Sequence, residues 1–216
     1  PAPKRRLSQA RPKNPKTATP HALPAPEDLA PPALTTFYLD ALRATVEAEG
    51  PDTIAAILAE PITGSSGGAL MPPPGYWAGV RALCDEYQIL LVLDEVMTGF
   101  GRTGTPFAYQ QFAIEPDILV AGKGLAGGYA PIGGIFASKA IGEAIREAGY
   151  SVMFHTFGAH PAACAGAAEV LAILVEEDLV TQAAGMQASL LGISLEAYVN
   201  DNDMLGHILR TIRGVE

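Results

Sequence analysis

Three charged residues each follow an apolar segment that is short enough to be a β-strand: Glu60, Asp94 and Lys123. A lysine amine can form a Schiff base with a carbonyl compound, and a carboxylate can hold a neighbouring positive charge. In open α/β sheets, ligands bind at the carboxyl ends of the strands. We therefore expect the three side chains to gather at one site. On position alone, Asp94 could instead be a helix-capping or surface residue, and Lys123 a solvated surface lysine.

The elements that would position these residues alternate between strands and helices. Apolar runs predict strands at 53–59, 89–93, 117–121 and 132–137, and helical patterns occupy 35–49, 75–87, 139–148, 160–176 and 179–200. The run at 89–93 (ILLVL) is apolar throughout, as expected for a strand that is buried on both faces. This order predicts an α/β protein with a mainly parallel sheet.

The composition is that of a folded protein. Of the 216 residues, 49% are hydrophobic and 17% are charged, which argues against disorder, and a net charge of −9 disfavours nucleic-acid binding. The sequence has no run of 18 apolar residues that would predict a transmembrane segment. Cys84 and Cys164 lie in apolar, helix-like surroundings, so we expect both to be buried thiols in a reducing compartment.

Residues 1–20 differ from the rest, because they hold six basic side chains, no acidic one and many prolines. Such a segment cannot pack a core, so we expect a flexible arm or loop. A tail for nucleic acids or anionic surfaces, or a targeting segment, are the alternatives. The first residue is Pro1, which suggests a processed or excised piece or an incomplete gene model.

The flanks of the two central residues carry a family resemblance. Asp94 lies in LLVLDEVMTGFGRTG, and Lys123 follows 29 residues later in PDILVAGKGLAGGYAPIGG. Together with FHTFGAHPAACAGAAEVL and AAILAEPITGSSGGALMPPPGYWAGVRALCDEYQILL, these segments resemble class III pyridoxal-phosphate-dependent aminotransferases over roughly residues 20–178. The resemblance implies the three-layer large domain of fold-type-I enzymes, with a mainly parallel sheet flanked by helices, incomplete at both ends.

The resemblance also implies roles for individual residues. Lys123 would hold pyridoxal 5'-phosphate and move a proton, and Asp94 would keep the pyridine nitrogen protonated. Val96 would pack on the cofactor ring. Thr156 would bind the cofactor phosphate across a dimer interface, which implies a homodimer with shared active sites, although an ordinary turn threonine is the alternative.

Three further positions relate to the cofactor and the substrate. Glu60 would help to fix the local network near the cofactor. Met97 stands where the family often has a glutamine, and its thioether cannot donate the hydrogen bond that an amide gives. Ser65 lies where some relatives use a glutamate to gate an arginine, so a serine there hints at ω-amino acid or amine donors. We interpret His155 and His160 as structural.

Parts of the family pattern are missing from this sequence. We find neither the Gly-Ser/Thr-rich phosphate turn nor the aromatic residue that stacks on the pyridine ring. The chain is thus expected to be a central slice of a longer enzyme, with a partial cofactor-binding domain at 21–176 and, at 177–216, a connecting helix and the start of a small C-terminal domain. Alone, it should bind the cofactor weakly.

The leading hypothesis is a transaminase that moves an amino group from an amine or ω-amino acid to a 2-oxo acid. Another pyridoxal-phosphate enzyme, such as an aminomutase, would share the same lysine and aspartate. A truncated, inactive dimerising fragment is a third interpretation. No metal, nucleic acid or membrane partner is expected. A cytoplasmic location is the default, and a mitochondrial one stays open.

Overall fold

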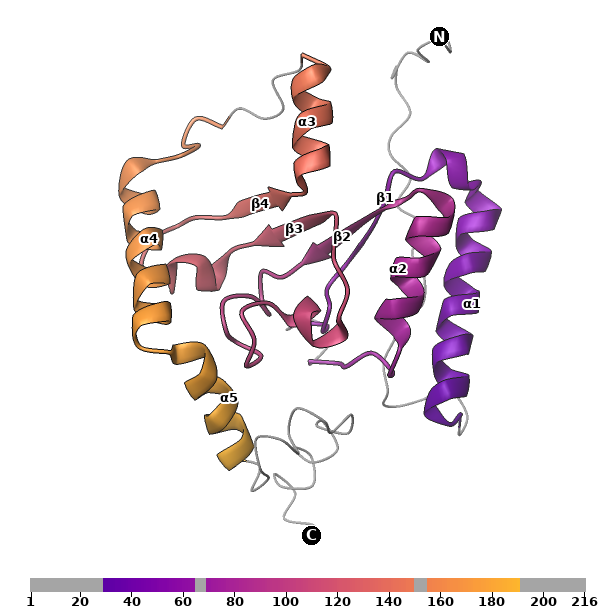
Figure 1. Cartoon of the computed structure of the whole chain (residues 1–216), viewed down its shortest axis with the longest axis horizontal. Helices are drawn as coiled ribbons and strands as arrows, with labels where there is room; N and C mark the ends of the chain where they lie inside the picture. Colours follow the sequence, from indigo (N-terminus) through magenta and orange to yellow (C-terminus); the bar gives the residue numbers. More distant parts are fainter. Residues whose placement is uncertain (1–28, 65–68, 150–154, 191–216) are drawn as a thin grey trace.

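The computed structural model describes residues 29–64, 69–149 and 155–190, and the predicted basic segment at 1–20 lies outside them. The helices are α1 (Pro31–Glu49), α2 (Tyr76–Tyr87), α3 (Lys139–Glu147), α4 (Pro161–Glu176) and α5 (Leu179–Leu190), with short 3-10 helices η1 (Pro51–Thr53), η2 (Ala108–Phe112) and η3 (Lys123–Ala126). The strands are β1 (Ala56–Ala59), β2 (Leu90–Asp94), β3 (Ile118–Ala121) and β4 (Gly134–Ala137). Figure 1 shows α1 and α2 side by side on one flank of the sheet and α4 at its other end.

The four described strands form one sheet in the order β1-β2-β3-β4. Strands β1, β2 and β3 are parallel, and β4 runs antiparallel to β3. The predicted α/β fold with a mainly parallel sheet is therefore confirmed. Among the described helices, none is long and apolar enough to cross a membrane.

The starts of α1 and β1 differ most from the residues that the sequence predicts. Helix α1 starts at Pro31 instead of residue 35, because proline is well suited to the first turn of a helix, where its missing N–H is not needed. The predicted strand at 53–59 is shorter, since Pro51–Thr53 forms a 3-10 turn before β1 begins at Ala56. The end of β1 at Ala59 agrees with the prediction.

The core lies between one face of the sheet and the two helices α1 and α2. Helix α1 buries a stripe with a spacing of four residues, Leu34, Tyr38, Leu42 and Val46. Strand β2 buries Leu91 and Leu93 against the same cluster. The alternate residues of the sheet point to the other face, where Leu58 is 67% exposed and Ile135 is 56% exposed. One face of the sheet is thus much better covered than the other.

This difference between the faces predicts unequal costs for the same substitution. Leu93→Ala removes a fully buried side chain, so we expect it to lower the free energy of unfolding by about 2–5 kcal/mol. Leu58→Ala, on the exposed face, is the matched control and should change it by less than about 0.5 kcal/mol. Urea unfolding followed by circular dichroism measures both. Equal losses would contradict the assignment of the two faces.

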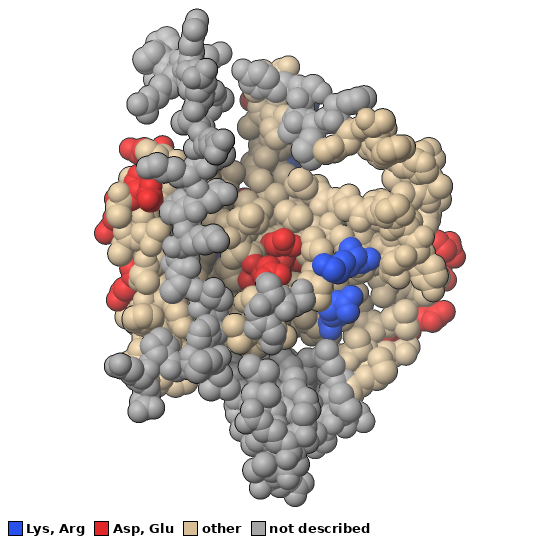
Figure 2. All heavy atoms as spheres, turned by 180° about the vertical axis from the view of Figure 1, so that it is seen from behind, with Lys and Arg blue, Asp and Glu red and all other residues tan. Residues whose placement is uncertain are grey.

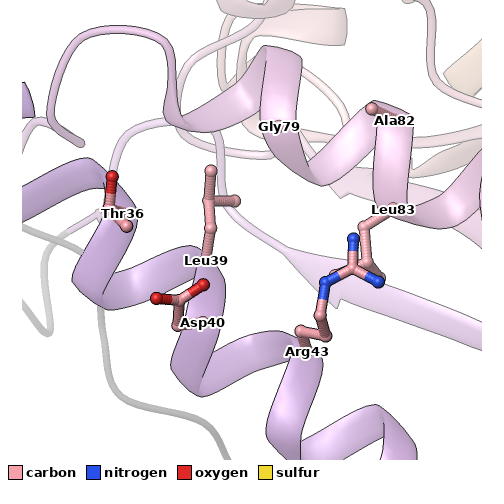
Figure 3. Close-up of a pocket in the computed structure, with 7 residues that line it drawn as sticks. All are labelled: Thr36, Leu39, Asp40, Arg43, Gly79, Ala82 and Leu83. Carbon is pink, nitrogen blue, oxygen red and sulfur yellow. The ribbon is translucent and has the colours of Figure 1, made fainter.

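The helices α1 and α2 approach closely at one point. A side chain at Gly79 of α2 would collide with Leu39 of α1, so the glycine permits the contact. Beside it lies a cavity of about 290 Å³, which Figure 3 shows between the two helices. Its lining is Thr36, Leu39, Asp40, Arg43, Gly79, Ala82 and Leu83, and it includes none of the predicted site residues.

The expectation of two buried cysteines is half correct. Cys84 is buried in the core under α1, but Cys164 is exposed. The prediction for Cys164 was wrong because α4 buries only small residues, Ala163 and Ala167, and its apolar composition does not indicate which face is covered. Burial raises the pKa of the Cys84 thiol to about 11.

Because a thiolate is the reactive form, the two cysteines should react at very different rates. At pH 8 we expect iodoacetamide to modify Cys164 within minutes and to leave Cys84 unmodified until the protein unfolds. The rate at which Cys84 reacts should rise only as the pH approaches its raised pKa of about 11, because below that pH Cys84 is a neutral thiol. Peptide mass spectrometry measures both sites, with Cys164→Ser as the control. Native-state labelling of Cys84 at pH 8 would refute its burial.

Candidate functional site

The parallel strands bring the three charged residues to one edge of the sheet. Glu60 follows β1 directly, Asp94 is the last residue of β2, and Lys123 stands two residues after β3. Asp94 is paired in register with Val120, three residues before Lys123. Neighbouring strands lie about 4.8 Å apart, so Asp94 and Lys123 leave adjacent strand ends. The ends of β1, β2 and β3 therefore lie at one edge of the sheet, and that these three side chains form one site stays a prediction.

Asp94 is half-buried, and a backbone amide already holds one of its oxygens. Its Oδ1 accepts a hydrogen bond of 3.0 Å from the N–H of Val96. This bond turns the chain at the end of β2 and fixes the carboxyl group. Among the described residues, the Oδ2 atom of Asp94 accepts no hydrogen bond, so it remains available to a ligand.

Val96 links the two strand ends. A methyl group placed on Gly122 would lie 3.5 Å from the side chain of Val96, which is ordinary van der Waals contact. Lys123 follows at once, with an exposed side chain and a left-handed φ of 37°. A positive φ is uncommon for residues other than glycine and clusters at functional sites.

Glu60 and Met97 meet on either side of a glycine. The N–H of Gly64 donates to Oε2 of Glu60 over 3.1 Å. A methyl group on Gly64 would lie 2.6 Å from Oε1 of Glu60 and 3.0 Å from Cγ of Met97, so only glycine fits between them. The structure therefore brings Glu60, Asp94, Val96, Met97 and Lys123 to one region. Ser65, the neighbour of Gly64, lies outside the described residues.

Thr156 is the one predicted site residue that the structure does not tie to the others. It is exposed in a turn before α4, and its hydroxyl makes no hydrogen bond with any described residue. In the same turn, His160 caps α4, with Nδ1 accepting from the N–H of Ala163 over 3.4 Å. This cap agrees with the structural role predicted for His160.

Glu95 is a buried acid that the sequence pattern did not single out. This carboxylate is 0% exposed and accepts hydrogen bonds from the Thr98 hydroxyl and from the backbone amides of Ala108 and Tyr109. A signal existed in the pair Asp94-Glu95, since two adjacent acids after a strand point to opposite sides of the chain. One of them must then face inward.

Figure 2, which views the molecule from behind, shows a group of acidic side chains near the middle of that face, with basic side chains beside it. An exposed amine and a half-buried carboxylate at adjacent strand ends can bind a ligand that carries both a carbonyl group and a protonated nitrogen. In the described part of the chain, no group of three metal-ligating side chains is found.

The chain is similar to proteins of known family. The sequence model for class-III aminotransferases matches residues 6–214 of the chain. The chain belongs to the class-III aminotransferase family. Enzymes of this family depend on pyridoxal 5'-phosphate, which fits the lysine and the carboxylate at the strand ends.

Individual relatives agree with the family. The chain is 41% identical over 152 residues to an omega-aminotransferase of Caulobacter vibrioides and 42% identical over 157 residues to a taurine–pyruvate aminotransferase of Rhodobacter capsulatus. These matches cover 68% and 70% of this chain, respectively, and 34% of each relative. A crystal structure of an (S)-enantioselective omega-transaminase from Thermomicrobium roseum aligns with a TM-score of 0.74 and 43% identity, over 77% of this chain and 37% of that one. This class-III chain therefore spans about a third of the length of its curated relatives.

Proposed function

We propose that this chain supplies the central cofactor site of a transaminase that moves an amino group from an amine or ω-amino acid to a 2-oxo acid. The observation that carries the proposal is the position of Asp94 and Lys123 at the ends of adjacent parallel strands. The side chain of Val96 lies near Gly122, where an added methyl group would be 3.5 Å from it. Membership of the class-III family supports the same reaction class.

The residues present fit pyridoxal 5'-phosphate. The cofactor has an aldehyde, which an amine can attach, and a pyridine nitrogen, which a carboxylate can keep protonated. Lys123 offers an exposed amine, and Asp94 offers one oxygen that no described residue engages. When bound, the cofactor supplies an electron-accepting ring to the substrate carbon that loses its proton.

Each side chain of the proposed site would have its own role. Lys123 would hold the cofactor through its Nζ and, when that amine is free, would move a proton at the same atom. Asp94 would keep a proton on the ring nitrogen, and Val96 and Met97 would provide apolar contact to the cofactor. Glu60 keeps the Gly64 turn in place. Thr156 would donate its hydroxyl to a phosphate in a partner subunit, so a homodimer with shared sites is part of the proposal.

A trapping experiment tests the cofactor site directly. The chain is mixed with excess pyridoxal phosphate and reduced with borohydride, and the labelled peptides are identified by mass spectrometry. We expect the pyridoxyl group on Lys123 and not on Lys139, an exposed lysine on α3 that serves as the internal control. Because the reduction is irreversible, it reports low occupancy as well. Equal labelling of both lysines would refute a specific site.

The substrates are proposed from the relatives. One is named an omega-aminotransferase and another a taurine–pyruvate aminotransferase, so we propose an amine or ω-amino acid donor and pyruvate or a related 2-oxo acid as acceptor. A half-reaction with the donor alone should release an oxo product. An aminomutase would instead return an isomer of its substrate, and an inactive fragment would return neither. The domain limits at 21–176 and 177–216 stay predictions.

A further inference from the structure

Glu95 is buried, charged and unused by the proposed chemistry. Its Oε1 accepts from the N–H of Tyr109 over 2.8 Å, and its Oε2 accepts from the N–H of Ala108 over 3.0 Å and from the hydroxyl of Thr98. A buried carboxylate is costly unless donors surround it, and here three do so. These bonds connect the end of β2 with the start of η2, more than ten residues later in the chain.

The backbone of Glu95 ties the same point to the sheet and to the following turn. Its N–H donates to the carbonyl of Val120 over 2.8 Å, and its carbonyl accepts from the N–H of Gly99 over 2.9 Å. Glu95 thus closes a loop, residues 95–109, at both of its ends. We refer to this segment as the carboxylate-closed loop.

The carboxylate-closed loop touches both neighbours of Lys123. Val96 lies near Gly122, within van der Waals reach of a methyl group placed on that glycine. On the other side, a methyl group on Gly124 would lie 2.9 Å from Cβ of Phe100 and 3.2 Å from the carbonyl oxygen of Gly99. The loop therefore lies against the backbone immediately before and immediately after the lysine.

Both surfaces of this contact hold a residue in an unfavourable backbone conformation. Phe100 has a φ of 60° and Lys123 a φ of 37°, and neither is a glycine. Such conformations persist only where the surrounding structure imposes them. The contact of Phe100 with Gly124 supplies that constraint for the lysine.

We propose that Glu95 is a positioning residue for Lys123: its buried carboxylate closes the loop that clamps Gly122 and Gly124, and so sets the place of the Lys123 amine. The proposal deepens the proposed function and rests on it for the role of the lysine. Glu95 itself does not touch the reacting atoms.

The hydrogen bonds that Glu95 accepts require a carboxylate, and an uncharged side chain of the same size would not suffice. The two backbone amides aim at different oxygens of Glu95, one at Oε1 and one at Oε2. In Glu95→Gln, one of these oxygens becomes an NH₂ group, which faces a donor and cannot accept from it. The Thr98 hydroxyl can rotate, but the amides of Ala108 and Tyr109 cannot. The isosteric variant must therefore release one end of the loop.

The test measures the Lys123 amine without the cofactor. Wild type, Glu95→Gln and Thr98→Val are labelled competitively with an amine reagent over a range of pH, and the extent at Lys123 is divided by that at Lys139. Glu147→Gln, the same change at an exposed position on α3, is the matched control. Hydrogen exchange at Ala108 and Tyr109 reports whether the loop has opened, and borohydride trapping reports cofactor attachment.

We expect Glu95→Gln to shift the pH profile of Lys123 but not that of Lys139, and to slow trapping at Lys123 by about tenfold or more, since small misplacements of a reacting group have large effects on rate. Thr98→Val, which removes one donor and keeps the carboxylate, should shift the profile less. Glu147→Gln should match wild type. Should Glu95→Gln fail to fold, the shift in Thr98→Val decides.

The outcomes separate the two proposals. Faster exchange at Ala108 and Tyr109 with an unchanged Lys123 profile would overturn the positioning role, because the loop would have opened without affecting the amine. If no pyridoxyl group is trapped on wild-type Lys123 but the pH profile of Lys123 shifts in Glu95→Gln, the cofactor site would be refuted and the positioning role of Glu95 would stand. If Glu95→Gln does not fold, an unchanged pH profile of Lys123 in a folded Thr98→Val would also overturn the positioning role of Glu95.

Discussion

Replacing Lys123 with alanine is expected to reduce amino-group transfer by about 10⁴-fold or more in the protein that carries this chain. The substitution removes both the point of cofactor attachment and the group that moves the proton, and positioned acid–base catalysis alone accounts for about 10²–10⁴-fold. The rate of oxo-product formation from an amine donor and a 2-oxo acid measures the loss. Lys123→Arg should be equally inactive, because a guanidinium keeps the charge but cannot attach an aldehyde.

Lys139 provides a control for this prediction, because it is also a lysine. Lys139 lies on α3, is 90% exposed at its side chain and pairs with Glu143 over 3.6 Å. Lys139→Ala should retain wild-type activity, since an exposed ion pair of this kind contributes little. Added methylamine should restore part of the activity of Lys123→Ala and none to Lys123→Arg. A Lys123→Ala protein with near-normal turnover would remove the lysine from the mechanism.

Asp94→Asn should produce the second-largest loss, about 10- to 100-fold in the same assay. A hydrogen bond to a charged group contributes about 1.5–3 kcal/mol, which corresponds to that range of rates. The amide oxygen of an asparagine can still accept the hydrogen bond from Val96 that Oδ1 accepts now. The turn after β2 should therefore keep its shape, so the variant isolates the charge on the carboxyl group.

The matched control is Asp40→Asn, which changes an exposed acid on α1. It should leave turnover unchanged. The thermal midpoint of both variants should stay close to that of wild type, which separates a loss of chemistry from a loss of folding. Full activity in Asp94→Asn would mean that the ring nitrogen is protonated by another group.

The strand ends could be predicted from the sequence because apolar runs and parallel order leave few choices. ILLVL is apolar throughout and has the length of a strand, and Asp94 then falls at its end, in register beside the strand that leads to Lys123. The pattern also places the end of β1 just before Glu60. The length and apolar composition of these runs are enough for such features.

The remaining features depend on contacts between distant segments, which no local pattern encodes. The inward turn of Glu95 requires the amides of Ala108 and Tyr109, which arrive from a 3-10 helix that the sequence did not suggest. The exposure of Cys164 depends on which face of α4 is covered. The role predicted for Thr156 concerns a partner subunit, so a single chain leaves it as a prediction.

The open face of the sheet has a practical consequence for anyone who handles this polypeptide. Leu58 and Ile135 project from strands that, in the described sheet, have a neighbour on one side only. Edge strands with exposed apolar side chains can pair with strands of other molecules, which favours aggregation in concentrated solution. A charged replacement such as Leu58→Lys would improve recovery of the purified material while leaving the Asp94–Lys123 edge intact.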